Sequence, residues 1–208
     1  QMPDLDKGLN DKQIISALEN LAYFHSLTYC YGQKSKTDFR IDYPMAYHSF
    51  LEGKDSQEFI ATLFKRAKDQ LIERNEHELA NILEILSKDY VSKFKFAYGG
   101  QDGRFLTHGD IWCNNLMFNK DGRCILVDWQ FTCASTPYLD IAAMAFMNQD
   151  PDTMDKNMDA FLKTYYEKFE DTCQKFDVKG PWNDFEDFKT TSNITRIFIV
   201  VCLAPVEF

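Results

Sequence analysis

One tight turn interrupts an otherwise helical pattern, and it constrains the fold more than any other feature of the sequence. The segment Asn119–Gly122 has the composition of a β-hairpin turn, with a glycine available for a left-handed conformation. Two short apolar runs flank this turn, Leu116–Phe118 before it and Cys124–Val127 after it. The second run has the character of a buried strand, so the sequence predicts a small hairpin inside a helical chain.

The turn also predicts which residues face one another across the hairpin. The predicted pairs are Phe118 with Arg123 and Leu116 with Ile125. Continuing this register carries Asn115 and Asp128 to the open end of the hairpin. Asp110 ends a short strand-like segment just before the first strand and should face the same place. Two carboxylates and one carboxamide are therefore expected to converge on one point.

Helical periodicity dominates the rest of the chain. Helices are predicted from Ile14 to His25 after a cap at Leu9-Asn10-Asp11, from Ser56 to Leu71, from Leu79 to Leu86, from about Tyr138, from Thr153 to Phe176, and from Asp184 onward. Between Tyr29 and Asp55 the periodicity fades, which predicts a long ordered loop. His25 falls on the apolar face of its helix and is expected to be a buried, hydrogen-bonded histidine. The fold class predicted is α+β and mainly helical.

Composition narrows the possible partners. The chain has 208 residues, of which 45% are hydrophobic, enough to bury the core of one domain. Its 23 basic and 32 acidic residues give a formal charge of −9, which disfavours nucleic acid and anionic membranes as partners. No signal sequence or membrane-spanning stretch is visible, so a cytoplasmic protein is expected. The six cysteines form no metal-binding spacing and are expected to be reduced.

The three converging side chains indicate a particular chemistry. Carboxylate and carboxamide oxygens are hard ligands that suit Mg²⁺, which often shares its coordination with substrate phosphates. His108, Asp110 and Asn115 have the His-x-Asp-x-x-x-x-Asn spacing of a phosphotransferase catalytic loop, and Asp128 follows where a second metal-binding Asp belongs. Asp140 after Pro137 could serve as a third metal ligand, but its position at the start of a predicted helix favours a structural role. The pattern favours phosphoryl transfer over a metal-dependent hydrolase, which would use the same carboxylates without this spacing.

The motif also resembles a known family. Its central residues are His108, Gly109, Asp110, Trp112, Asn115, Met117 and Phe118, followed by Asp128-Trp129-Gln130. This is similar to the ecdysteroid-kinase-like (CHK kinase-like) family of the aminoglycoside phosphotransferase and choline kinase superfamily, which has a protein-kinase-like fold. The chain departs from the family's Asp-Phe-Gln motif only at Trp129, which keeps an aromatic ring.

The resemblance implies an enzyme that transfers phosphate from ATP, with Mg²⁺, to a hydroxyl group of a small molecule. In this interpretation Asp110 is the catalytic residue, and Asn115 and Asp128 hold the metal. His108 and Asp140 would support the catalytic loop through hydrogen bonds rather than act in the reaction. The family name favours a steroid-like alcohol as acceptor, while choline-like and aminoglycoside acceptors stay open.

The resemblance also implies a domain assignment. Residues 1–208 are expected to form the C-terminal, catalytic lobe of a protein-kinase-like fold, truncated at both ends. The N-terminal nucleotide lobe is expected to be absent, so no nucleotide-binding residues are assigned, and the isolated chain is expected to be inactive. The alternative is a pseudokinase, a non-catalytic binding or scaffold protein that lacks the nucleotide lobe.

Overall fold

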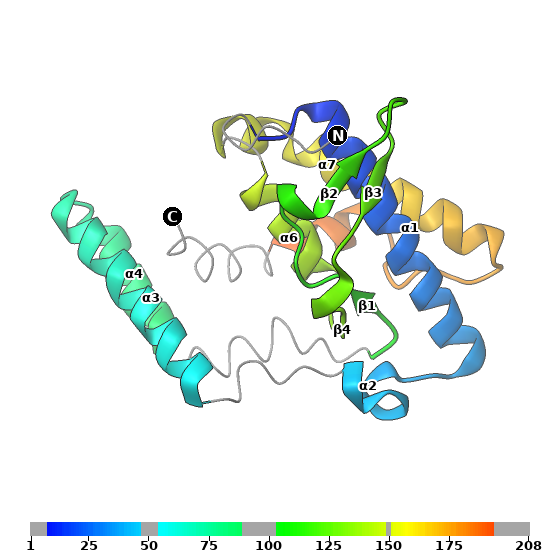
Figure 1. Cartoon of the computed structure of the whole chain (residues 1–208), viewed down its shortest axis with the longest axis horizontal. Helices are drawn as coiled ribbons and strands as arrows, with labels where there is room; N and C mark the ends of the chain where they lie inside the picture. The colour runs from blue at the N-terminus through cyan, green and yellow to red at the C-terminus, as the bar shows by residue number, and fades with distance from the viewer. Residues whose placement is uncertain (1–7, 47–53, 89–102, 149–150, 194–208) are drawn as a thin grey trace.

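The computed structural model describes residues 8–46, 54–88, 103–148 and 151–193, which form an α+β fold dominated by helices (Figure 1). The helices are α1 Asp11–Ser35, α2 Phe39–Asp42, α3 Lys54–Glu73, α4 His77–Ser87, α6 Tyr138–Met147 and α7 Pro151–Lys175, with a last helical segment at 185–193. Two antiparallel sheets of two strands each lie between them: β1 Leu106–Thr107 with β4 Cys133–Ala134, and β2 Leu116–Phe118 with β3 Cys124–Leu126. The predicted fold class is confirmed.

Helix α1 begins at a capping box. The Asn10 side chain accepts the Gln13 backbone N–H (3.1 Å), and the Gln13 side chain accepts the Asn10 backbone N–H (3.0 Å). Two N–H groups that have no partner within the helix are thereby satisfied. The cap predicted from the sequence is confirmed at Asn10.

The loop predicted from Tyr29 onward was wrong, because α1 continues to Ser35 and a short helix α2 follows. Gly32 lies within α1 and is buried. A Cβ atom at Gly32 would lie 3.1 Å from Cβ of Arg104, so the glycine allows the chain near Arg104 to pass close to the helix. The remainder of the predicted loop, residues 47–53, lies outside the described residues.

The main core lies between α1, α6 and α7, and aromatic rings fill much of it (Figure 1). Its fully or almost fully buried aromatic members are Tyr29, Phe105, Phe161, Tyr165, Phe169 and Phe188. Tyr165 and Phe188 stack with ring centroids 5.6 Å apart, which joins α7 to the last helical segment. Within the described ranges, no helix is long and apolar enough to cross a membrane.

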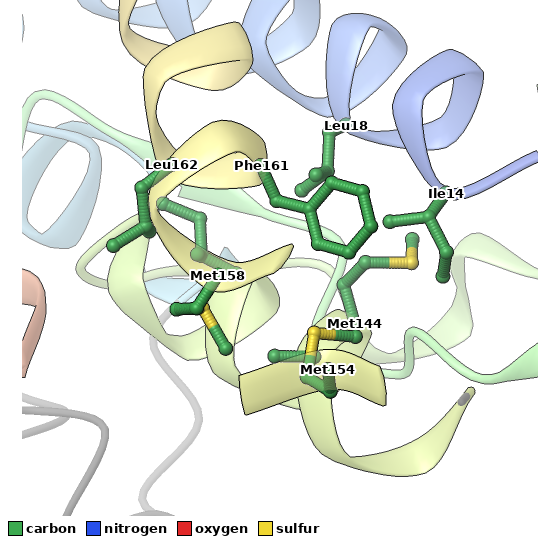
Figure 2. Close-up of a pocket in the computed structure, with 9 residues that line it drawn as sticks. Ile14, Leu18, Met144, Met154, Met158, Phe161 and Leu162 are labelled. Carbon is green, nitrogen blue, oxygen red and sulfur yellow. The ribbon is translucent and has the colours of Figure 1, made fainter. Parts of the chain in front are cut away.

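A small cavity between α1, α6 and α7 has only apolar walls (Figure 2). In Figure 2, Ile14 and Leu18 of α1 face Met144 of α6 and Phe161 of α7. The space measures about 10 Å³, which is barely the volume that one water requires, and it offers no polar partner. This cavity is therefore a packing gap in the core and not a substrate site.

Helices α3 and α4 pair with each other and stand apart from the main body (Figure 1). Their contact is a separate apolar cluster built on Ile60 and Phe64 of α3 and Leu83 of α4. Lys68 and Glu84 add an ion pair across the two helices, with 2.6 Å between Nζ and Oε2. The helix pair thus has a core of its own.

The five described cysteines are free thiols, as predicted. Four of them are buried, and burial raises the pKa of the Cys124 thiol to about 12. A thiol with so high a pKa stays protonated at neutral pH and reacts slowly. Cys202 lies outside the described residues.

Candidate active site

Hairpin β2–β3 has a register one residue away from the predicted one. The observed pairs are Leu116 with Leu126, Met117 with Ile125, and Phe118 with Cys124. The reason is a wider turn, in which the Asn119 side chain accepts the backbone N–H groups of Asp121 and Arg123, both at 2.9 Å. Gly122 adopts a φ of 79° in this turn. The second strand is also less buried than predicted, because Ile125 is 53% exposed.

The corrected register changes which residue faces Asn115. The Val127 N–H donates to the Asn115 carbonyl at 3.0 Å, so these two residues continue the strand pairing. Asp128 follows Val127 directly and therefore still leaves the hairpin at the end where Asn115 enters it. Helix α1 contacts the other end of the hairpin, next to the turn, where the Ser16 hydroxyl accepts the Cys124 N–H at 2.9 Å.

Asp110 and Asn115 are in direct contact. The Asn115 amide donates to Oδ2 of Asp110 at 2.8 Å and to its backbone carbonyl at 2.9 Å. Asn115 is only 6% exposed, while Asp110 is partly buried. Both N–H groups of the amide point to Asp110, so Oδ1 is the atom that Asn115 can offer to a cation.

Asp128 has a left-handed backbone, with φ 63° and ψ 66°. This conformation is uncommon for a residue with a side chain and tends to occur where function requires it. The Asp128 side chain is exposed, and its carboxylate accepts a hydrogen bond from Gln130 at 3.3 Å. The structure therefore joins Asp110 to Asn115. Asp128 lies where the neighbouring strand β3 leaves the hairpin, and its carboxylate bonds to Gln130 and not to Asp110 or Asn115.

The His108 ring is engaged by backbone groups on both sides. Its Nε2–H donates to the Val127 carbonyl at 2.9 Å, and its Nδ1 accepts the Asp110 N–H at 3.3 Å. The ring is fully buried and packs against Trp129, with 4.5 Å between ring centroids. His108 therefore links the segment that carries Asp110 to the segment that carries Asp128.

Asp140 lies beneath the same loop on α6 and is fully buried. Its Oδ2 accepts the His108 N–H at 2.6 Å, and its Oδ1 accepts the Gly109 N–H at 2.9 Å. Charge-assisted bonds of this kind are stronger than neutral ones. Asp140 thus fixes the backbone of the two residues that precede Asp110.

Two residues that contact this framework could not be assigned to it from the sequence. His25 is fully buried on α1, as predicted, but its Nε2 also donates to Oδ2 of Asp140 at 3.0 Å. Its Nδ1 lies 2.7 Å from the hydroxyl oxygen of Tyr165 on α7. The only sequence signal was a histidine in an apolar helix face, which does not reveal its partner.

The donor atoms near Asp110 are consistent with Mg²⁺. Within the described residues, no group of three His, Cys, Asp or Glu side chains is arranged to hold a metal ion. A cation here would take oxygen ligands from Asn115 and Asp128 and complete its coordination with phosphate and water, as Mg²⁺ usually does. An exposed carboxylate and a carboxamide oxygen whose N–H groups are already used fit that requirement.

Gly109 allows the loop to take its path. It has a φ of 82°, and a Cβ atom there would clash with the backbone carbonyl oxygen of Phe131. We expect Gly109→Ala to lower the free energy of unfolding by at least about 3 kcal/mol, because backbone strain and a clash act together. Urea denaturation followed by circular dichroism measures this loss.

Gly122 provides the matched control. Its φ of 79° is nearly the same, but nothing lies within 4 Å of a Cβ atom placed there. Gly122→Ala should therefore cost only the conformational strain, about 1–2 kcal/mol. Equal losses in the two variants would show that crowding at Phe131 does not matter.

Together, the fold and the site define a mainly helical α+β lobe in which a short loop presents an Asp–Asn pair beside a hairpin that ends in a second Asp. Residues 1–178 match the family model described as "Ecdysteroid kinase-like family". The chain belongs to the ecdysteroid kinase-like family, and the resemblance seen in the sequence is confirmed. Searches of curated proteins and of solved structures give no match.

Proposed function

We propose that this chain is the catalytic lobe of an enzyme that uses ATP and Mg²⁺ to phosphorylate a hydroxyl group of a small molecule. Membership of a kinase-like family supports phosphoryl transfer in general. The observation that supports it most is the Asp110–Asn115 pair, which a buried hydrogen-bond framework holds at the end of the hairpin.

Each residue then has a distinct role. Asp110 orients the acceptor hydroxyl and accepts its proton, while its Oδ2 is fixed by Asn115. Asn115 and Asp128 would hold Mg²⁺, which, when bound, neutralises charge on the nucleotide phosphates. His108 is excluded as the base because backbone groups occupy both of its ring nitrogens.

Exposed apolar side chains near the site suit an acceptor with an apolar body. Trp129 and Phe131 lie one and three residues after Asp128 and are 40% and 50% exposed. Aromatic surfaces of this kind bind flat apolar molecules, and they also attract organic cations. A steroid-like alcohol is therefore our first choice of acceptor, and choline-like and aminoglycoside alcohols are the alternatives.

A phosphorylation screen of the complete protein tests this function. The protein would be incubated with ATP labelled at the γ-phosphate, Mg²⁺, and panels of steroids, amino alcohols, sugars and simple alcohols. We expect transfer to one panel and its loss in the Asp110→Asn variant. Absence of both nucleotide binding and transfer to any acceptor would instead support the pseudokinase alternative.

A further inference from the structure

A buried chain of hydrogen bonds runs from α7 through α1 and α6 to the catalytic loop. It passes from Tyr165 to His25, from His25 to Asp140, and from Asp140 to the backbone of His108 and Gly109. Tyr165, His25 and Asp140 are all fully buried. Side chains from three helices that are distant in sequence thus meet beneath the residues that precede Asp110.

The hydrogen-bond partners of His25 determine which of its ring nitrogens carries a proton. A carboxylate only accepts hydrogen bonds, so Nε2 of His25 carries the proton that it shares with Asp140. In a neutral imidazole, Nδ1 is then the acceptor for the Tyr165 hydroxyl. Burial raises the pKa of Tyr165 well above its ordinary value, so this hydroxyl stays protonated and remains a donor.

The consequence for Asp140 is geometric. Its Oδ2 receives two donors, the His108 N–H at 2.6 Å and His25 Nε2–H at 3.0 Å, while Oδ1 receives the Gly109 N–H. Without His25, two neighbouring backbone donors from one loop would be the only bonds described for this carboxylate. The bond from a separate helix fixes the carboxylate plane against the body of the fold.

We infer that His25 and Tyr165 are positioning residues for the phosphoryl-transfer reaction, acting through Asp140 on the backbone that carries Asp110. This inference rests on the proposed function, because Asp110 is the residue whose position it explains. Small displacements of a reacting group lower rates strongly, and a shift of 1 Å is worth about 10²-fold. Neither His25 nor Tyr165 hydrogen-bonds to Asn115 or Asp128, so the effect should fall on kcat more than on KM for ATP.

Two substitutions of His25 separate its hydrogen bond from its volume. In His25→Gln, the side-chain amide can take the place of Nε2 and still donate to Asp140. In His25→Asn, the amide reaches only the position of Nδ1, so the bond to Asp140 is lost. We expect His25→Asn to lower kcat by about 10- to 100-fold with KM for ATP unchanged. His25→Gln loses only the bond to Tyr165 and should lower kcat no more than Tyr165→Phe does.

Tyr165→Phe removes only the hydroxyl group that bonds to His25. This variant tests the same hydrogen-bond series if His25→Asn does not fold. Tyr29→Phe is its matched control, since Tyr29 is equally buried but its hydroxyl donates to the Lys179 carbonyl at 3.3 Å. Tyr165→Phe should lower kcat several-fold, and Tyr29→Phe should leave it unchanged. Equal kcat in all four variants, or equal losses in His25→Gln and His25→Asn, would overturn the inference.

A second readout is independent of activity. In ¹⁵N-labelled complete protein, the amide signals of His108 and Gly109 report the bonds to Asp140. They should move most in His25→Asn, less in Tyr165→Phe and His25→Gln, and stay in place in Tyr29→Phe. A wild-type protein without transferase activity would refute the proposed function, and the amide signals would then decide the positioning role. Unmoved signals in His25→Asn would refute that role even in an active enzyme.

Discussion

Replacing Asp110 by Asn in the complete protein is expected to lower kcat by about 10²- to 10⁴-fold while leaving ATP binding nearly intact. Under the proposed function, the substitution removes the charge that accepts the hydroxyl proton but keeps an oxygen that Asn115 can bind. Its effect should therefore fall on the acceptor side of the reaction. Steady-state kinetics and direct titration with ATP and Mg²⁺ measure the two quantities separately.

Asp128→Asn is the comparison variant. It preserves the size of a side chain in a left-handed backbone that Asn adopts readily, so the fold should be kept. Loss of one carboxylate from a Mg²⁺ site should weaken binding of the Mg²⁺–ATP complex, by at least about 10-fold. If both variants lose the same affinity for nucleotide, the assignment of Asp110 to the acceptor and Asp128 to the metal is incorrect.

Replacing Asp140 by Ala is expected to produce the largest loss of stability. The substitution leaves the N–H groups of His108 and Gly109 and the Nε2–H of His25 buried without their acceptor. Removing one partner from a buried charged network typically costs about 3–5 kcal/mol. The free energy of unfolding from urea titration should fall by that amount.

An exposed aspartate on the neighbouring helix provides the control. Asp159 of α7 pairs with Lys189, but 69% of its side chain is exposed. Asp159→Ala should therefore change the free energy of unfolding by at most about 1 kcal/mol. A loss at Asp140 as small as this would mean that water satisfies the loop backbone once the carboxylate is gone.

Periodicity predicted the long elements of this fold well and the short ones poorly. Helix α7 was expected at Thr153–Phe176 and lies at Pro151–Lys175, because a long amphipathic stretch repeats its signal many times. Strands β1 and β4 have two residues each, too few for any period, and β4 was not predicted. The end of α1 was missed because the helical periodicity fades after Tyr29, although the helix continues through Gly32, which packs closely against Arg104.

Residues of the candidate site could be selected from the sequence, but the hydrogen bonds that join them could not be predicted. Motif spacing selected Asp110 and Asn115, and the structure joins them through two hydrogen bonds. The register around Asn119 was wrong because side-chain bonds within the turn decide its width, and spacing alone does not encode them. The bond from His25 to Asp140 depends on how α1 crosses α6, which only the packed structure reveals.

The separate packing of α3 and α4 has a consequence for how this protein can change over evolutionary time. Because this helix pair buries Ile60, Phe64 and Leu83 against one another, a substitution there alters a local opening equilibrium and leaves the hydrogen bonds around Asp110 untouched. Changes in the length, charge or outer surface of the helix pair should therefore leave the Asp110–Asn115 contact in place. The fold thus combines a hydrogen-bonded framework around Asp110 with a helix pair whose changes should stay local.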